Sequence, residues 1–140
     1  MTEKEKYVLH CLQSRSYNLR RLAELTEAMT RLSYKITPSY SESGGHSSGK
    51  PQSKVENHVI KQERMEKAMA KCREELMMAE AVLNCKELSK QEYAAVECVA
   101  LGGTMTTFAA TWGIYNSYAY KIRDRAIKKA LKHISRLETG

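Results

Sequence analysis

A chain of 140 residues, 42% of them hydrophobic and 28% charged, is long enough for one compact domain or for a small domain with a helical arm. This composition excludes two large domains and wholesale disorder. The formal charge of +7 favours a polyanionic partner, and seven Lys/Arg against two acids in residues 104–140 make the C-terminus the most basic part. With no apolar run of transmembrane length and early charges in MTEKEKYVLH, we expect no membrane partner, no signal peptide and a cytoplasmic protein.

The cysteines and histidines predict no metal site and no cofactor. The four cysteines show no CxxC spacing, and the four histidines are scattered singly among them. Each cysteine falls within a helical pattern, where a reduced thiol acts as a small apolar side chain. Paired carboxylates, a nucleophile with a base and a phosphate-cradling Gly loop are also missing from the sequence, so we expect no enzyme.

Residues 1–37 are predicted to form the first helix of a hairpin. The stretch contains no Gly or Pro before Ile36, and a 3,4 spacing of apolar residues marks one narrow seam. Upstream the same register passes Asn18 and Arg15, so we expect the helix to bend or fray there. The seam consists of Leu22, Leu25, Met29, Leu32 and Ile36.

The predicted hairpin continues with a Ser/Gly-rich linker at residues 38–53. A second helix with an apolar seam of the same 3,4 spacing follows at residues 54–87. An antiparallel, coiled-coil-like pairing within the chain is the economical arrangement, and pairing between two subunits of a homodimer is the alternative. The second seam comprises Val55, His58, Gln62, Met65, Met69, Cys72, Leu76, Ala79 and Leu83.

Residues 88–140 are predicted to form three helices with glycines between them, which completes an all-α fold. Ser89 and Glu92 have the spacing of a capping box before the first of these helices. The next two helices satisfy the constraints of a helix-turn-helix, with the small residue Ala109 where the backbones approach and Gly113 in the turn. The other positions expected to face inward are Phe108, Trp112, Ile114, Ala119 and Ile122.

The outward face of the last helix carries residue types that contact DNA. Asn pairs with adenine, Ser and Tyr donate to phosphates or bases, and Lys and Arg neutralise phosphates. We therefore expect this helix to enter the major groove of double-stranded DNA. The predicted DNA-binding residues are Asn116, Ser117, Tyr118, Tyr120, Lys121, Arg123 and Arg125.

The stretch LSKQEYAAVECVALGGTMTTFAATWGIYNSYAYKIRDRAIKKAL is similar to the region-four domain of sigma factors. The helical arm, the phrase KITPSYS and the Gly/Ser loop resemble the small sigma-like regulators encoded by phages and prophages of Gram-positive bacteria. The resemblance implies a transcription regulator of phage genes, associated with the nucleoid of the host cell and contacting RNA polymerase. It also implies a recognition helix that starts just after the turn, at Asn116.

Two other functions fit the same pattern. A small terminase-like DNA-packaging subunit also combines a helix-turn-helix with an oligomerising hairpin, and assembly into a ring would distinguish it from a regulator. An interaction or inhibitor protein would use the same fold to bind a host protein, and absence of DNA affinity would identify it.

Overall fold

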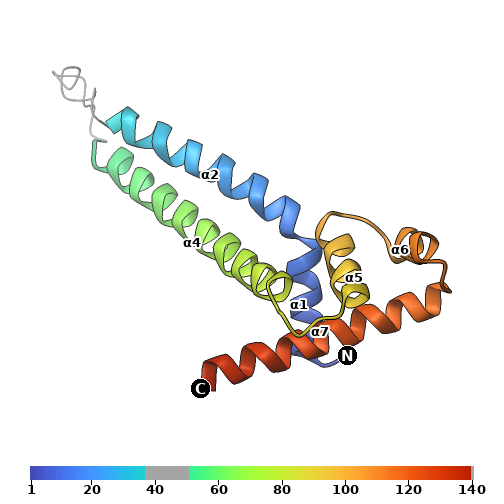
Figure 1. Cartoon of the computed structure of the whole chain (residues 1–140). Coiled ribbons are helices and arrows are strands. Elements are labelled where there is room, and N and C mark those ends of the chain that lie inside the picture. The colour runs from blue at the N-terminus through green and yellow to red at the C-terminus, as the bar shows by residue number, and fades with distance from the viewer. Residues whose placement is uncertain (37–50, 140) are drawn as a thin grey trace. The chain divides into compact units, whose positions relative to one another are not determined.

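The structure is a computed structural model that describes residues 1–36 and 51–139, with side chains described for residues 1–33 and 57–138. The described residues form helices and no strand, so the predicted all-α class is confirmed. In chain order the helices are α1 (Glu3–Gln13), α2 (Arg15–Ile36), α4 (Pro51–Leu83), α5 (Lys90–Ala100), α6 (Met105–Trp112) and α7 (Asn116–Thr139) (Figure 1).

The described chain divides into two compact units. One unit comprises Met1–Leu19 with Glu74–Gly140, and the other comprises Arg20–Arg73. The predicted first helix of the hairpin, residues 1–37, thus has its first 19 residues in one unit and its continuation from Arg20 in the other. The buried face of α1, which includes Val8, Cys11 and Leu12, belongs to the same core as the C-terminal helices.

The N-terminal helix is broken at Ser14, close to the bend that the sequence predicts. Thr2 caps α1 in a capping box with Glu5, and Ser14 ends the helix with a backbone N–H bond to the carbonyl of His10. The polar residues that interrupt the seam have polar partners in the last turns of α4. The Asn18 amide donates to Glu75 Oε1 at 3.1 Å, and Arg15 Nε donates to Glu80 Oε1 at 2.8 Å.

The unit Arg20–Arg73 contains two antiparallel helical segments, one from α2 and one from α4 (Figure 1). They pack within the chain through the predicted seams, with Leu25 buried against Met69 and Cys72. Helix α4 begins at Pro51 and ends at Leu83, so it starts and stops earlier than the predicted 54–87. Residues 38–50 of the predicted linker lie outside the described residues, while 51–53 are helical.

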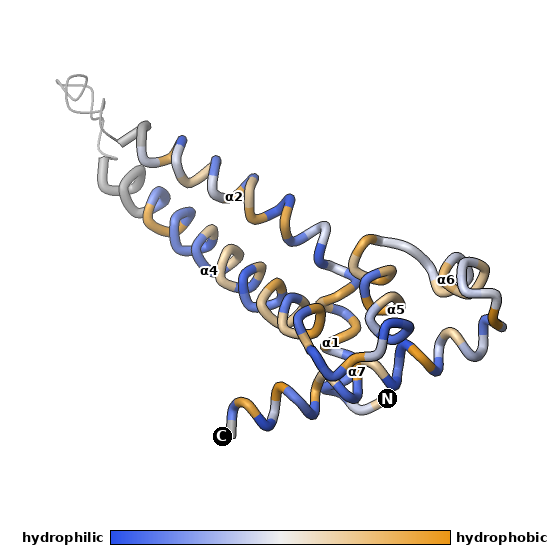
Figure 2. The backbone as a smooth tube through the Cα atoms, viewed as in Figure 1, coloured by the Kyte–Doolittle hydropathy of each residue, from blue (hydrophilic) through white to orange (hydrophobic). Residues whose placement is uncertain are grey.

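The larger unit is organised around α7, which packs against α1, α5 and α6. Hydrophilic and hydrophobic stretches alternate along α7 (Figure 2), as expected for a helix with one buried face. That face carries small and branched apolar residues at helical spacing, and the small ones let neighbouring helices approach closely. Its fully buried members are Ala119, Ile122, Ala126, Ile127 and Ala130.

No described helix combines the length and apolar character needed to cross a membrane.

Candidate nucleic-acid interface

Helices α6 and α7 are joined by a tight turn at Gly113. Thr104 caps the start of α6 by accepting the N–H of Thr107, and Gly113 ends the helix in the left-handed conformation, with φ 64° and ψ 39°. The N–H of Ile114 then bonds to the carbonyl of Ala109 at 3.0 Å. Glycine suits this position because residues with a Cβ rarely adopt positive φ. The turn therefore fixes where α7 starts.

The residues predicted to face inward are buried at four positions. Phe108, Ala109, Ala119 and Ile122 have between 0% and 3% of their surface exposed. Ile114, just after the turn, is partly buried against the same core. These contacts hold α6 on α7 and leave the opposite side of α7 exposed.

Trp112 was expected to face inward, but 43% of its surface is exposed. Its ring lies against Phe108, with ring centroids 6.0 Å apart and planes tilted by 44°. Trp112 is the last residue of α6, and a side chain in a terminal turn has helical neighbours on one side only. Its position on the apolar stripe of α6 is therefore not enough to bury it.

Four of the predicted DNA-binding residues are exposed in the first turns of α7, and we call them the recognition edge: Asn116, Ser117, Tyr118 and Lys121. Within the described part of the chain, these four side chains have no hydrogen-bonding or ion-pairing partner. No acidic residue occurs in the first turn of α7. Since the first backbone N–H groups of a helix lack partners within it, this end of α7 favours anions.

The other three predicted residues already have partners in the protein. Arg123 donates from Nε and Nη2 to Asp124 Oδ1, at 3.0 and 2.8 Å, and its guanidinium lies 4.9 Å from the centroid of the Tyr120 ring. Arg125 Nε donates to Glu92 Oε2 at 3.2 Å. The guanidinium groups of Arg123 and Arg125 are therefore already paired with carboxylates of the protein.

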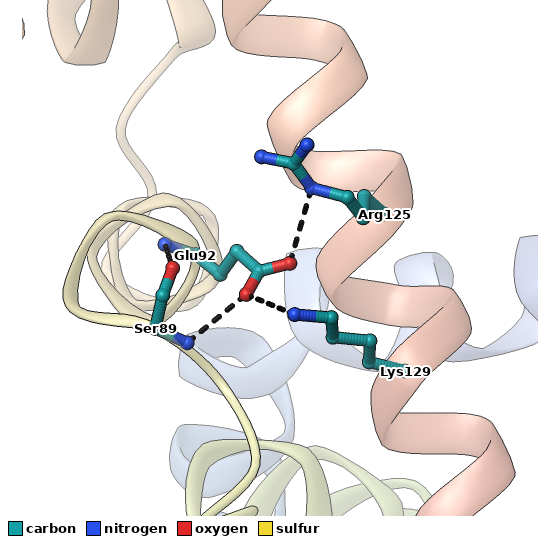
Figure 3. Close-up of polar contacts among 4 residues, drawn as sticks. All are labelled: Ser89, Glu92, Arg125 and Lys129. Carbon is teal, nitrogen blue, oxygen red and sulfur yellow. Dashed lines mark hydrogen bonds and ion pairs between the residues drawn. The ribbon is translucent and has the colours of Figure 1, made fainter.

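Glu92 makes contacts with α7 that the sequence did not predict, although its role in the cap of α5 was predicted. Its side chain is 1% exposed. Its carboxylate accepts hydrogen bonds from the backbone N–H of Ser89 at 3.0 Å and from Lys129 Nζ at 2.9 Å (Figure 3). Burial raises the pKa of Glu92, but hydrogen bonds from Lys129 and Ser89 outweigh it and lower the pKa from 4.5 to about 2. Figure 3 shows the carboxylate between the start of α5 and the two cations of α7.

Among the residues that the structure describes, no three His, Cys, Asp or Glu side chains come together to hold a metal ion. Comparison of the chain with known protein families, curated proteins and solved structures finds no match.

Proposed function

We propose that this chain is a sequence-specific DNA-binding protein that inserts the first turns of α7 into the major groove. The observation that carries the proposal is the recognition edge, on a helix whose start is fixed by the turn at Gly113. Its polar side chains are exposed and have no partner among the residues that the structure describes. Polar side chains with unused donors and acceptors on a rigid helix suit the reading of base edges.

The residues of the recognition edge divide in the proposal into two that contact bases and two that contact phosphates. The amide of Asn116 can pair with the N6 and N7 atoms of adenine, and the ring of Tyr118 can contact a thymine methyl group. Ser117 and Lys121 bind phosphate oxygens and set the register of the helix on the duplex. Arg123 and Arg125 hold Asp124 and Glu92, so they contribute less to DNA affinity than their charge suggests.

The resemblance to sigma-like phage regulators supports the biological role in the proposal, a transcription regulator of phage or prophage genes. RNA polymerase as a second partner is supported by that resemblance alone. The experiment that tests the central proposal is the selection of bound duplexes from random oligonucleotides. We expect an enriched motif, and a palindromic motif with half-sites about one helical turn apart would indicate a dimer.

Titrations of the selected duplex then test the separate roles of the residues. We expect Lys121→Ala to weaken binding to all sequences and to lower the salt dependence by about one phosphate contact. Asn116→Ala should cost about 1 to 3 kcal/mol at one base position and relax the preference there. Lys61→Ala, an exposed change on α4, is the matched control and should leave affinity unchanged.

Absence of duplex binding even at low salt would overturn the proposal, because phosphate contacts are strongest there. Equal loss on all sequences for both α7 variants would contradict the division between base and phosphate contacts. A large ring-shaped assembly in light scattering would favour the DNA-packaging alternative.

A further inference from the structure

A second surface of the same unit lies at the other end of α7. The first turn of α1 and the C-terminal half of α7 enclose an open groove of about 480 Å³. Lys4 and Glu5 line it from α1, and Lys128, Leu131 and Lys132 line it from α7. We propose that this groove binds an acidic, amphipathic segment of a partner protein. This second binding function goes beyond the proposed DNA binding and does not depend on it.

The floor of the groove is apolar. Leu131 is partly buried, with one side against the main core, and part of its side chain remains accessible in the groove. Lys128 and Lys132 lie one turn apart on either side of this position along the helix, and long lysine side chains cover apolar surface with their methylene groups. A groove of this size is suited to an apolar anchor side chain from a partner.

The free charge around this floor is positive. Lys4, Lys128 and Lys132 are exposed, and within the described part of the chain none of them has a hydrogen-bonding or ion-pairing partner. Glu5 is the acid that lines the groove, but it is buried and its carboxylate accepts the N–H of Thr2 at 3.2 Å in the cap of α1. An occupant that carries carboxylates beside an apolar residue therefore complements the groove in charge and in polarity.

Duplex DNA fits this groove less well than an acidic peptide. At about 1.5 Å per residue, Lys128 and Lys132 lie about 18 and 24 Å along α7 from Asn116, whereas the major groove is about 12 Å wide and 8.5 Å deep. If the first turns of α7 insert into the major groove of DNA, Lys128 and Lys132 therefore lie outside that major groove. A phosphate backbone also offers no apolar group to cover Leu131, whereas an amphipathic helix offers one at every turn.

The test begins with a random-peptide display selection against the full chain. We expect enriched peptides to carry a large apolar residue flanked by Asp or Glu. One such peptide, synthesised with a fluorescent label, is then titrated by anisotropy. Because a single groove of this size supports a weak, transient contact, we expect a dissociation constant in the micromolar range, on the order of 10 μM.

Charge reversal locates the binding site. The double variant Lys128→Glu/Lys132→Glu should lower peptide affinity about tenfold or more, and Lys128→Gln/Lys132→Gln, which removes the charge without reversing it, should give a smaller loss. Lys67→Glu/Lys71→Glu is the matched control, since it changes two exposed lysines with the same spacing on α4. It should leave peptide affinity unchanged.

Selected peptides without acidic residues, or peptide binding that survives the charge reversal at Lys128 and Lys132, would overturn the proposal. DNA titration of the same double variant separates this proposal from the preceding one. Loss of DNA affinity as large as that of Lys121→Ala would assign the two lysines to phosphates instead. Unchanged DNA affinity with lost peptide affinity would support two separate surfaces on α7.

Discussion

Replacing Glu92 with Gln should destabilise the larger unit in a way that depends on pH. The carboxylate is buried, and its pKa is lowered from 4.5 to about 2 by Lys129 and Ser89 against the opposing effect of burial. A difference of this size corresponds to about 3 kcal/mol of stability at neutral pH. Because the pKa is lower in the folded state, this stability is fully present above pH 4.5 and is lost as the pH falls towards 2.

The measurement is urea denaturation of wild type and Glu92→Gln, followed by circular dichroism at several pH values between 7 and 2.5. We expect the difference in unfolding free energy to be about 3 kcal/mol at pH 7 and to shrink steadily below pH 4.5. Glu97→Gln changes an exposed carboxylate on the same helix and should differ from wild type by less than about 0.5 kcal/mol. A difference for Glu92→Gln that stays constant across this pH range would refute the role of its charge.

Two further predictions concern the turn between α6 and α7. Trp112→Ala should cost about 1 to 2 kcal/mol in thermal denaturation, because the half-exposed ring loses less than the 3 to 5 kcal/mol typical of a buried aromatic; complete unfolding would mean that the ring is buried. Gly113→Ala should cost about 1 to 2 kcal/mol, since its added Cβ meets open space and only the positive φ opposes it. Gly113→Asn should cost less because Asn tolerates this conformation, and equal losses for the two variants would point to a steric cause.

Periodicity in the sequence predicts which face of each helix is buried, because that depends on spacing alone. It identifies Leu25 and Cys72 as seam residues and Ile122 as a core residue of α7, and all three are buried. It also predicts the weakness of the first helix near Arg15 and Asn18. It does not predict the partners of these two residues, which lie 65 and 57 positions further along the chain.

The same limit explains what was missed at the candidate interface. The spacing of Ser89 and Glu92 predicts a cap, and the cap is present. That the same carboxylate also binds Arg125 and Lys129 depends on how α5 lies against α7, which no local pattern encodes. A count of basic residues therefore overestimates the charge that α7 offers to a ligand. Exposure of Trp112 likewise depends on where neighbouring helices end.

These ion pairs bear on how the recognition edge is oriented. Glu92 lies at the start of α5 and binds α7 through two cations one turn apart, so it restrains both the position and the rotation of α7. Asn116 stands on the same continuous helix, a little more than two turns before Arg125. In the proposed complex, base readout requires this edge to keep one orientation while Lys121 holds a phosphate. In that complex the buried Glu92 carboxylate would touch no DNA and would act on base readout by fixing α7, the helix that carries the recognition edge.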